Sequence, residues 1–361
     1  MESNMPKREL FMKILNYEKF DHMPVLHWVG WDEFNIKLEK ETGVGVYDQA
    51  EYFDAESIGV KSYLDMINTE LYPPFEEEVI EETDKYSIVR AKDGVVLKKF
   101  KEKSSIPHFI DFTLKDRSSL KEYKKRLRYT EERFEKNWVE KAQGYKDLGN
   151  LIIFNAGSMI GWIRNWMGVE NLAITLYDDP DMIRELVDVT SDMVCKLAER
   201  VAKEIQIDIG SFWEDICFRN GPLVSPKHFK EIAGPGYKKI TSTMKNLGVD
   251  HSIVDCDGVV ESLVPIWLDN GIDVIYPFEI GVWNADPMEY RKKFGKELRI
   301  IGGVDKRVLY KSYKEIDDEI ERRIPLMKEG GYIPMLDHLL PPDTDLDKYR
   351  YYLEKIRSLR F

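Results

Sequence analysis

Acidic residues recur in this sequence where apolar runs end. Asp255 and Asp257 follow "HSIV", Glu279 closes "IDVIYPFE", and Asp337 and His338 close "YIPMLDH". Crowded carboxylates repel one another, so one of them can hold a proton near neutral pH and act as a general acid. Histidine is the side chain that titrates closest to neutrality. We therefore expect proton transfer, with His338, Asp257 and Glu279 as catalytic residues.

A larger set of side chains is expected to bind substrate around the same place. Lysine and arginine would offset the acidic charge or hold a substrate carboxylate, and the tryptophan run "SMIGWIRNWMG" would line an apolar pocket. His27 lies near the end of the early apolar run "MPVLHWV" and could reach the same place. The expected residues are Glu214, Asp215, Asp255, Asp305, Lys306, Asp337, Trp162, Arg164 and His27.

Each of these residues also has a structural reading. An acid that follows a strand often caps the next helix, and a tryptophan stripe often belongs to the core. The functional reading depends on several strand ends meeting in one place, and on acids paired with a lysine and a histidine. Serine, threonine and asparagine, which also cap helices, are scarce at these positions.

The order of the elements predicts that meeting place. From residue 150 onward, apolar strands alternate with helical segments, a pattern typical of βαβ units and a parallel sheet. The expected strands are 151–156, 205–214, 249–258, 272–279, 298–305 and 332–338. With "MPVLHWV" and "IGVKSYLD" (58–65), they make eight. This count favours a single (β/α)8 TIM barrel, whose strands present their carboxyl ends on one face.

Two further features are expected outside the barrel repeat. The first 20 residues have helical spacing, with Leu10, Ile14 and Tyr17 on one face, and form an N-terminal helical extension. Alternating runs on both sides of Asp93-Gly94 predict a β-hairpin insertion near 70–110. We expect one barrel domain over 1–361.

Composition excludes several classes of function. The chain of 361 residues is 43% hydrophobic and carries a formal net charge of −12, which argues against nucleic acid or an anionic membrane as partner. No segment approaches ~18 uncharged apolar residues, and the N-terminal residues show no secretory signal. We therefore expect a cytoplasmic protein. The three cysteines are far apart and predict neither a disulfide framework nor a structural zinc site.

Longer motifs resemble the uroporphyrinogen decarboxylase superfamily, which contains heme-pathway decarboxylases and corrinoid-linked methyltransferases. They are "LNYEKFDHMPV", "LYDDPDMIRELVD", "GPLVSPKHFKEIAGPGYKKI", "DCDGVVESLVPIWLDNGIDVIYPFE", "IIGGVDKRVL" and "GGYIPMLDHLLPP". The resemblance covers nearly the whole chain in order. It implies a single (β/α)8 barrel and a homodimer.

The sequence departs from both main branches of that superfamily. The decarboxylases carry an arginine-rich loop after the first strand, where this chain reads "LHWVGWDEFNIK"; this argues against uroporphyrinogen as substrate. Their last-strand histidine does match His338. The zinc-dependent methyltransferases use His-x-Cys after the fifth strand and a later Cys, and this set is absent. Cys256 falls between the two ligand positions, so strand alternation should point it away. An oxygen-rich zinc site with Asp257, Glu279 or His338 is the alternative that these residues leave open.

The pattern "EDICFRNGPLVSP" with "DCDG" and "DHLLPP" resembles a divergent branch grouped with methyltransferases of corrinoid systems. It implies transfer of a methyl group between a small O- or N-methyl substrate, a corrinoid protein, and a tetrahydrofolate or thiol acceptor. The corrinoid (cobalamin) would be carried by a partner protein. The alternatives are a carboxy-lyase acting on a carboxylated ring and a non-catalytic binding barrel.

Overall fold

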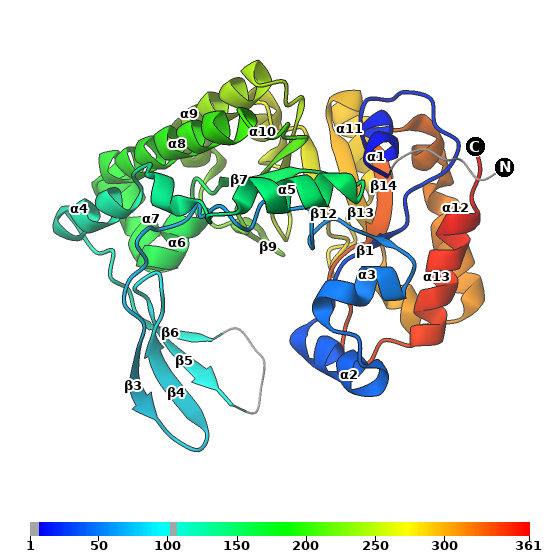
Figure 1. Cartoon of the computed structure of the whole chain (residues 1–361), viewed down its shortest axis with the longest axis horizontal. Helices are drawn as coiled ribbons and strands as arrows, with labels where there is room; N and C mark the ends of the chain where they lie inside the picture. Colours follow the sequence, from blue (N-terminus) through cyan, green and yellow to red (C-terminus); the bar gives the residue numbers. More distant parts are fainter. Residues whose placement is uncertain (1–6, 102–106) are drawn as a thin grey trace.

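The computed structural model describes residues 7–101 and 107–361. Its centre is a six-stranded parallel sheet in the order β14-β13-β12-β11-β8-β7 (Figure 1). The strands are β7 (Ile153–Gly157), β8 (Ile209–Trp213), β11 (His251–Asp255), β12 (Val274–Phe278), β13 (Arg299–Val304) and β14 (Tyr332–Leu336). Asp255 is in register with Trp213 on one side and Tyr276 on the other, so these strands end at one level.

A second parallel pair completes the barrel order. β1 (Leu26–His27) pairs with β2 (Glu56–Ser57), and single parallel bridges join Gly30 to Leu340 and Tyr63 to Ile153. Within the described residues, the six strands and this pair supply eight parallel strands in barrel order. The predicted α/β barrel fold is therefore confirmed, with a continuous ladder over six strands and isolated bridges at both edges of the short pair.

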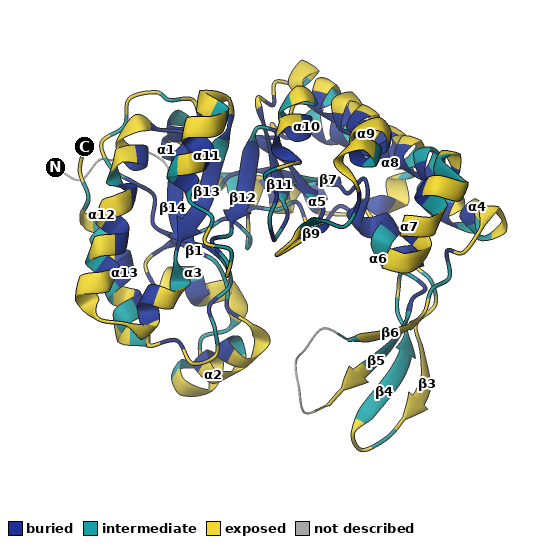
Figure 2. Ribbon diagram, turned by 180° about the vertical axis from the view of Figure 1, so that it is seen from behind, coloured by how far each residue is buried: buried dark blue, intermediate teal, exposed yellow. Residues whose placement is uncertain are grey.

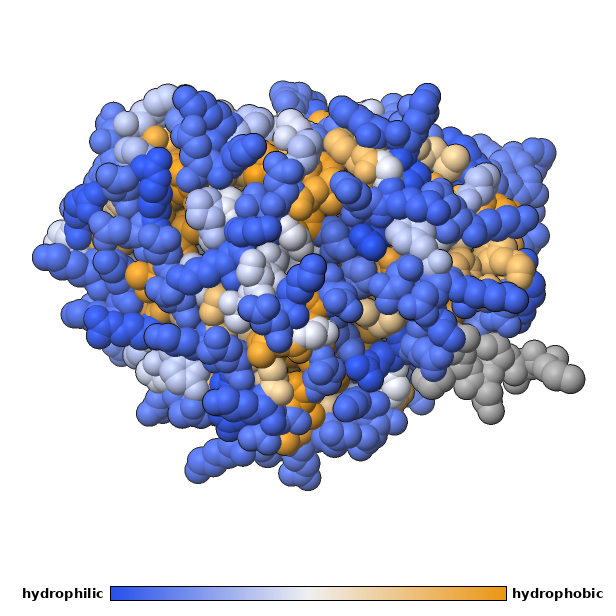
Figure 3. All heavy atoms as spheres, turned by 90° about the horizontal axis from the view of Figure 1, so that it is seen from above, coloured by the Kyte–Doolittle hydropathy of each residue, from blue (hydrophilic) through white to orange (hydrophobic). Residues whose placement is uncertain are grey.

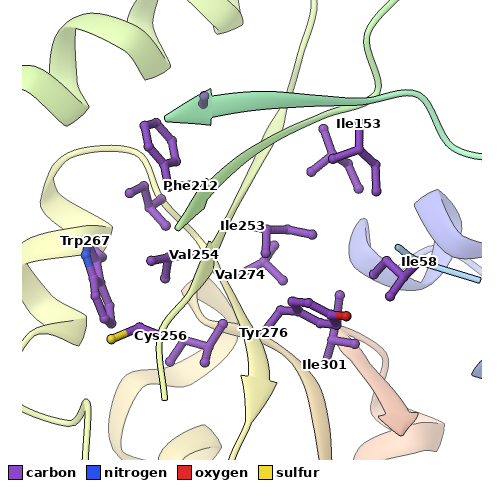
Figure 4. Packing of buried hydrophobic residues seen from close by; sticks show 14 of the residues in the cluster. Ile58, Ile153, Phe212, Ile253, Val254, Cys256, Trp267, Val274, Tyr276 and Ile301 are labelled. Atoms are coloured by element: carbon purple, nitrogen blue, oxygen red, sulfur yellow. The ribbon is translucent and has the colours of Figure 1, made fainter. Parts of the chain in front are cut away.

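The strands are buried because they are apolar on both faces. β12 and β14 are buried at every residue, as expected for parallel strands covered by helices. In Figure 2 the strands of the central sheet are mostly dark blue, while the outer faces of the helices are exposed. Figure 4 shows Ile153, Ile253, Val274 and Ile301, from four of these strands, gathered in the interior.

Helices surround the sheet, and their ends follow local sequence signals. α8 (Pro180–Ala202) and α9 (Pro226–Asn246) each begin with proline after a side-chain cap, Asp179 and Ser225, and they pack side by side. The other helices are α2 (Asp32–Thr42), α3 (Gln49–Tyr52), α4 (Arg117–Arg126), α5 (Trp138–Asp147), α6 (Gly161–Met167), α7 (Val169–Asp178), α10 (Val264–Asp269), α11 (Pro287–Phe294), α12 (Tyr313–Glu329) and α13 (Leu346–Ser358).

The two expected additions to the barrel are present. Helix α1 (Lys7–Leu15) buries Leu10 and Ile14, although Tyr17 lies beyond its end. The hairpin of β4 (Tyr86–Arg90) and β5 (Val96–Phe100) turns at Asp93-Gly94 as predicted. It is the centre of a four-stranded antiparallel sheet, because β3 (Glu78–Glu82) and β6 (His108–Asp111) flank it. This sheet projects from the barrel (Figure 1).

The outer surface is largely polar. The face seen from above in Figure 3 is mostly hydrophilic, with small apolar areas between charged side chains. None of the described helices is both long and apolar enough to cross a membrane.

Candidate active site

Two loops from opposite parts of the sequence bring a histidine and a carboxylate together. His338 follows β14 and Asp257 follows β11, and the His338 Nε2 atom lies 3.2 Å from Asp257 Oδ2. Trp31 stacks on the imidazole with ring centroids 5.5 Å apart, and Trp28 meets it edge-on at 5.7 Å. The His338 Nδ1 atom is buried without a hydrogen-bond partner among the described residues. The ring is thus held by packing, with one nitrogen on Asp257.

Glu279, just beyond β12, is the third member of this cluster. Its Oε2 atom accepts the backbone N–H of Gly258 at 2.9 Å. Gly258 has φ +89°, and a Cβ there would lie 2.6 Å from the backbone carbon of Cys217, so the turn requires glycine. Burial raises the pKa of Glu279, and the negative charge of Asp257 adds to the shift. The protonated form of Glu279 is therefore favoured.

Asp215 and Asp255 extend the acidic cluster. Burial raises the pKa of both, although Arg164 beside Asp215 acts in the opposite direction. The Arg164 Nη2 atom lies 3.5 Å from Asp215 Oδ2. Asp215 has φ +44°, an uncommon value for a residue with a side chain, which marks a turn under local constraint.

Asp255 also lies in the wall of a cavity of about 540 Å³, a volume typical of small-molecule sites. The cavity opens between the strand ends of the barrel and the base of the projecting sheet. Its lining comprises Tyr63, Asn68, Glu70, Leu71, Pro74, Lys92, Asp93, Asn155, Trp162, Asn165, Trp166, Ser211, Trp213 and Asp255. The prediction that Trp162 lines a pocket agrees with this position.

Two of the acids predicted to bind substrate instead accept hydrogen bonds from backbone N–H groups. Glu214 is fully buried, and its two carboxylate oxygens accept the N–H groups of Met159, Ile160 and Gly161 at 2.6–3.0 Å. Asp337 is also buried and accepts N–H groups from Ile280 and Lys306. Neither carboxylate is free for substrate, because both satisfy amides at the starts of loops.

Asp305 and Lys306 shape a turn as well. Asp305 caps the 3-10 helix η4 (Lys306–Tyr310) through the N–H of Arg307 and pairs with the Arg307 guanidinium. Lys306 contacts Asp337 through its backbone N–H, and its side chain is half-buried. Asp305 therefore has a structural role in place of the expected role in substrate binding, whereas substrate binding by the Lys306 side chain stays a prediction.

His27 does not reach the mouth, contrary to the prediction. It is buried between the barrel and α13, with Nδ1 2.7 Å from the Tyr349 hydroxyl and Nε2 3.1 Å from Gln49 Oε1. Burial lowers its pKa to about 4. Strand alternation explains the error, because the next residue, Trp28, is the one that contacts His338.

Arg164 lies at the edge of the site. Its guanidinium contacts the Asp215 backbone oxygen and Asn165 Oδ1, and it sits 5.6 Å from the Trp213 ring centroid. Sequence reasoning missed Tyr63 and Ser211, whose hydroxyls lie 2.7 Å apart at the cavity. Both lie in predicted strands, so the alternation of side chains along each strand could have identified them as facing the cavity.

With this geometry established, comparison with known proteins places the chain. The family model described as "Uroporphyrinogen decarboxylase (URO-D)" matches residues 152–359, more than half of the chain. The chain belongs to the uroporphyrinogen decarboxylase family. The superfamily inferred from the motifs is thereby confirmed.

The relatives within this family are distant. The uroporphyrinogen decarboxylase of Synechocystis is 23% identical over 189 residues, covering 51% of this chain and 50% of the relative. The chloroplastic uroporphyrinogen decarboxylase of Nicotiana tabacum is 26% identical over 207 residues, 56% of this chain and 48% of the relative. The chain thus spans about half the length of the curated relatives it matches.

A solved structure shares the fold over the whole chain. The methyltransferase from Methanosarcina mazei is 14% identical, with a TM-score of 0.59, and the match covers 98% of this chain and 97% of that one. At this identity the likeness concerns the fold alone.

The thiolate zinc site of the family's methyltransferases does not fit these residues. The Cys256 thiol is buried beside Trp267 (Figure 4), and burial raises its pKa, with Cys217 as its neighbour. The Cys256 sulfur lies 3.6 Å from the backbone oxygen of Asp257 and packs in the interior. Among the residues that the structure describes, no three His, Cys, Asp or Glu side chains are grouped as a metal site.

Proposed function

We propose that this member of the uroporphyrinogen decarboxylase family is a methyltransferase of a corrinoid-dependent system. It would move a methyl group between a small O- or N-methyl substrate, a corrinoid protein, and a tetrahydrofolate or thiol acceptor. The observation that carries the proposal is the acidic lining of the mouth. Asp215, Asp255, Asp257 and Glu279 surround it, and acids, whether ionised or protonated, do not supply the cations that a ring with several carboxylates requires.

The loop after β1 supports the same choice. Where the decarboxylases are expected to carry arginines, this chain places Trp28 and Trp31 against His338. Arg164, a basic side chain beside the acidic cluster, is engaged by Asp215. The mouth therefore offers apolar ring faces and proton donors rather than cations. The shared fold with a methyltransferase is consistent with this proposal.

The residues of this chain would bind the donor and manage a proton. Glu279, with its raised pKa, and the His338–Asp257 pair lie where a leaving group at the mouth would need protonation. A bound corrinoid would supply the strongly nucleophilic metal that accepts the methyl group. The stacked Trp31, 42% exposed, would limit the access of water to His338 from the rim.

The proposal is tested by adding a reduced corrinoid and O- or N-methyl donors to the purified protein. We expect a donor-dependent change in the visible spectrum of the corrinoid, and its loss when His338 is replaced by Ala. An unchanged corrinoid with donors of both classes, under conditions where the protein is folded, would contradict it.

A carboxy-lyase acting on a carboxylated ring is the second candidate. The family match and the last-strand histidine His338 favour it. It requires cations that bind carboxylates, and among the described basic residues at the strand ends Arg164 is engaged by Asp215 and Arg307 by Asp305, which leaves Lys306 as the candidate. Release of CO2 from a carboxylated tetrapyrrole, with no methylation of the corrinoid, would establish it.

A further inference from the structure

Asp255 differs from Asp215, Asp257 and Glu70 because it has no basic partner among the described residues. Asp215 pairs with Arg164, Asp257 lies 3.2 Å from His338, and Glu70 pairs with Lys92 at 3.3 Å. The Asp255 side chain makes no hydrogen bond within the described part of the chain, although it faces the cavity. A half-buried carboxyl without a cation or a donor is most stable in its neutral form.

The titratable groups facing Asp255 all favour that neutral form. Asp257 and Asp215 are negative neighbours, and together with burial they raise its pKa well above the usual range. Tyr63 and Tyr276 also face it, and burial raises the pKa of both phenols, so they stay uncharged. The cavity therefore presents a carboxylic acid as a proton donor.

The walls of the cavity are suited to a flat, neutral molecule. Trp162, Trp166 and Trp213 contribute ring surfaces, and the paired hydroxyls of Tyr63 and Ser211 supply a polar patch near Asp255. The charge of Glu70 is offset by Lys92, and burial raises the pKa of Asp93, which favours its neutral form. Little net charge is left to attract a permanent cation.

We propose that Asp255 protonates the oxygen from which the methyl group departs, and that the cavity accepts methyl ethers of small aromatic alcohols. This inference rests on the proposed methyltransferase function and narrows its donor from O- or N-methyl compounds to one class. The C–O bond breaks with both electrons on oxygen, which takes the proton of Asp255. The methyl carbon forms its new bond with the lone pair of the nucleophilic acceptor, a reduced corrinoid. Asp255 regains its proton from solvent by way of Glu279 and the His338–Asp257 pair, which handle protons at the mouth and pass them to Asp255.

A methylated ammonium donor would need no such proton, because a neutral amine leaves when its methyl group departs. A bound ammonium ion would also favour ionised Asp255. An ether donor therefore requires protonated Asp255, whereas an ammonium donor favours ionised Asp255. The Asp255→Asn variant distinguishes the two donor classes.

The test measures methyl transfer to reduced corrinoid from methoxybenzene, 4-nitromethoxybenzene and tetramethylammonium. In Asp255→Asn we expect transfer from methoxybenzene to fall about 100-fold or more, the usual effect of a general acid. The loss should be smaller with 4-nitromethoxybenzene, because its phenolate leaves more readily without a proton. Asp250→Asn, exposed just before β11 at the opposite end of that strand, is the matched control and should transfer at the parental rate.

A loss in Asp255→Asn that is equal for both ethers, or below about threefold, overturns the proton-donor role. Preferential transfer from tetramethylammonium overturns the donor class while leaving the methyltransferase function intact. No transfer from any of the three donors counts against the methyltransferase function itself and removes the proton-donor step with it.

Binding tests the cavity separately from transfer. Quenching of tryptophan fluorescence should report binding of methoxybenzene in the parental protein, and Trp162→Ala should weaken it about tenfold. Tighter binding of tetramethylammonium, strengthening as pH rises through ionisation of Asp255, would overturn the assignment even if no transfer is observed.

Discussion

The Nε2 atom of His338 lies 3.2 Å from Asp257 Oδ2, although the two residues come from loops that follow the last and the fifth strands of the barrel. Trp31 and Trp28 hold the imidazole against this contact. The pair joins two of the acidic strand ends seen in the sequence. It also gives the mouth a proton-transfer group supported by a carboxylate.

This pair should control activity rather than folding. We expect His338→Gln and Asp257→Asn each to lower kcat by about 100-fold to 10,000-fold, the range for lost acid–base catalysis. Methyl-transfer kinetics, with circular dichroism to verify folding, measure this. His228→Gln, on α9 beside Tyr177, is the control and should keep its activity. Folded pair variants within threefold of the parent would remove His338 and Asp257 from the mechanism.

Glu214 should matter for stability instead. Glu214→Ala leaves the N–H groups of Met159, Ile160 and Gly161 without their buried acceptor. The expected loss in the free energy of unfolding is about 3 kcal/mol or more, from about 1–3 kcal/mol for each unpaired group. Urea denaturation at constant m-value measures it. Glu204→Ala, an exposed acid, should cost about 0.5 kcal/mol or less; an equal, small loss in both variants would refute the capping role.

His27 should make stability depend on pH. Its folded pKa of about 4 lies below the usual value of 6.5, so the unfolded chain binds more protons between these values. This contribution is complete above pH 6.5, and stability falls as pH drops from 6.5 towards 4. Denaturation midpoints across this range should show the slope in the parental protein and in His108→Gln, an exposed control, but a weaker slope in His27→Gln. An unchanged slope in His27→Gln would contradict the account.

The three cysteines should be inert in the native protein. All are buried, and burial raises the pKa of the Cys195 and Cys256 thiols, which lowers the fraction of reactive thiolate. A thiol reagent should label all three only after unfolding. Cys256→Ala should keep activity within about threefold. Rapid native labelling of Cys256, or loss of activity together with bound zinc, would reinstate a thiolate metal site.

Periodicity and the motifs were enough to predict the barrel, the hairpin and the family. The acidic strand ends were also correctly located, because parallel strands in register bring their carboxyl ends to one level. The direction of each side chain was harder to predict. His27 was expected at the mouth, but strand alternation turns it away and brings the next residue, Trp28, against His338.

Partners of individual acids could not be deduced from the sequence. Glu214 and Asp215 are adjacent in the sequence. Glu214 is fully buried and accepts backbone N–H groups of the loop before α6, whereas Asp215 faces Arg164. Their roles depend on where a loop distant in sequence presents its N–H groups. The aromatic contacts of His338 depend likewise on the path of the chain after β1.

The central claim is that this mouth transfers methyl groups and does not decarboxylate a carboxylated ring. The most direct measurement applies two assays to one preparation of the protein. One follows transfer of a labelled methyl group to reduced corrinoid, and the other follows release of labelled CO2 from uroporphyrinogen. We predict methyl label on the corrinoid, abolished in His338→Gln, with no CO2 above background. Release of CO2 that depends on His338, with no methyl label on the corrinoid, would contradict the account.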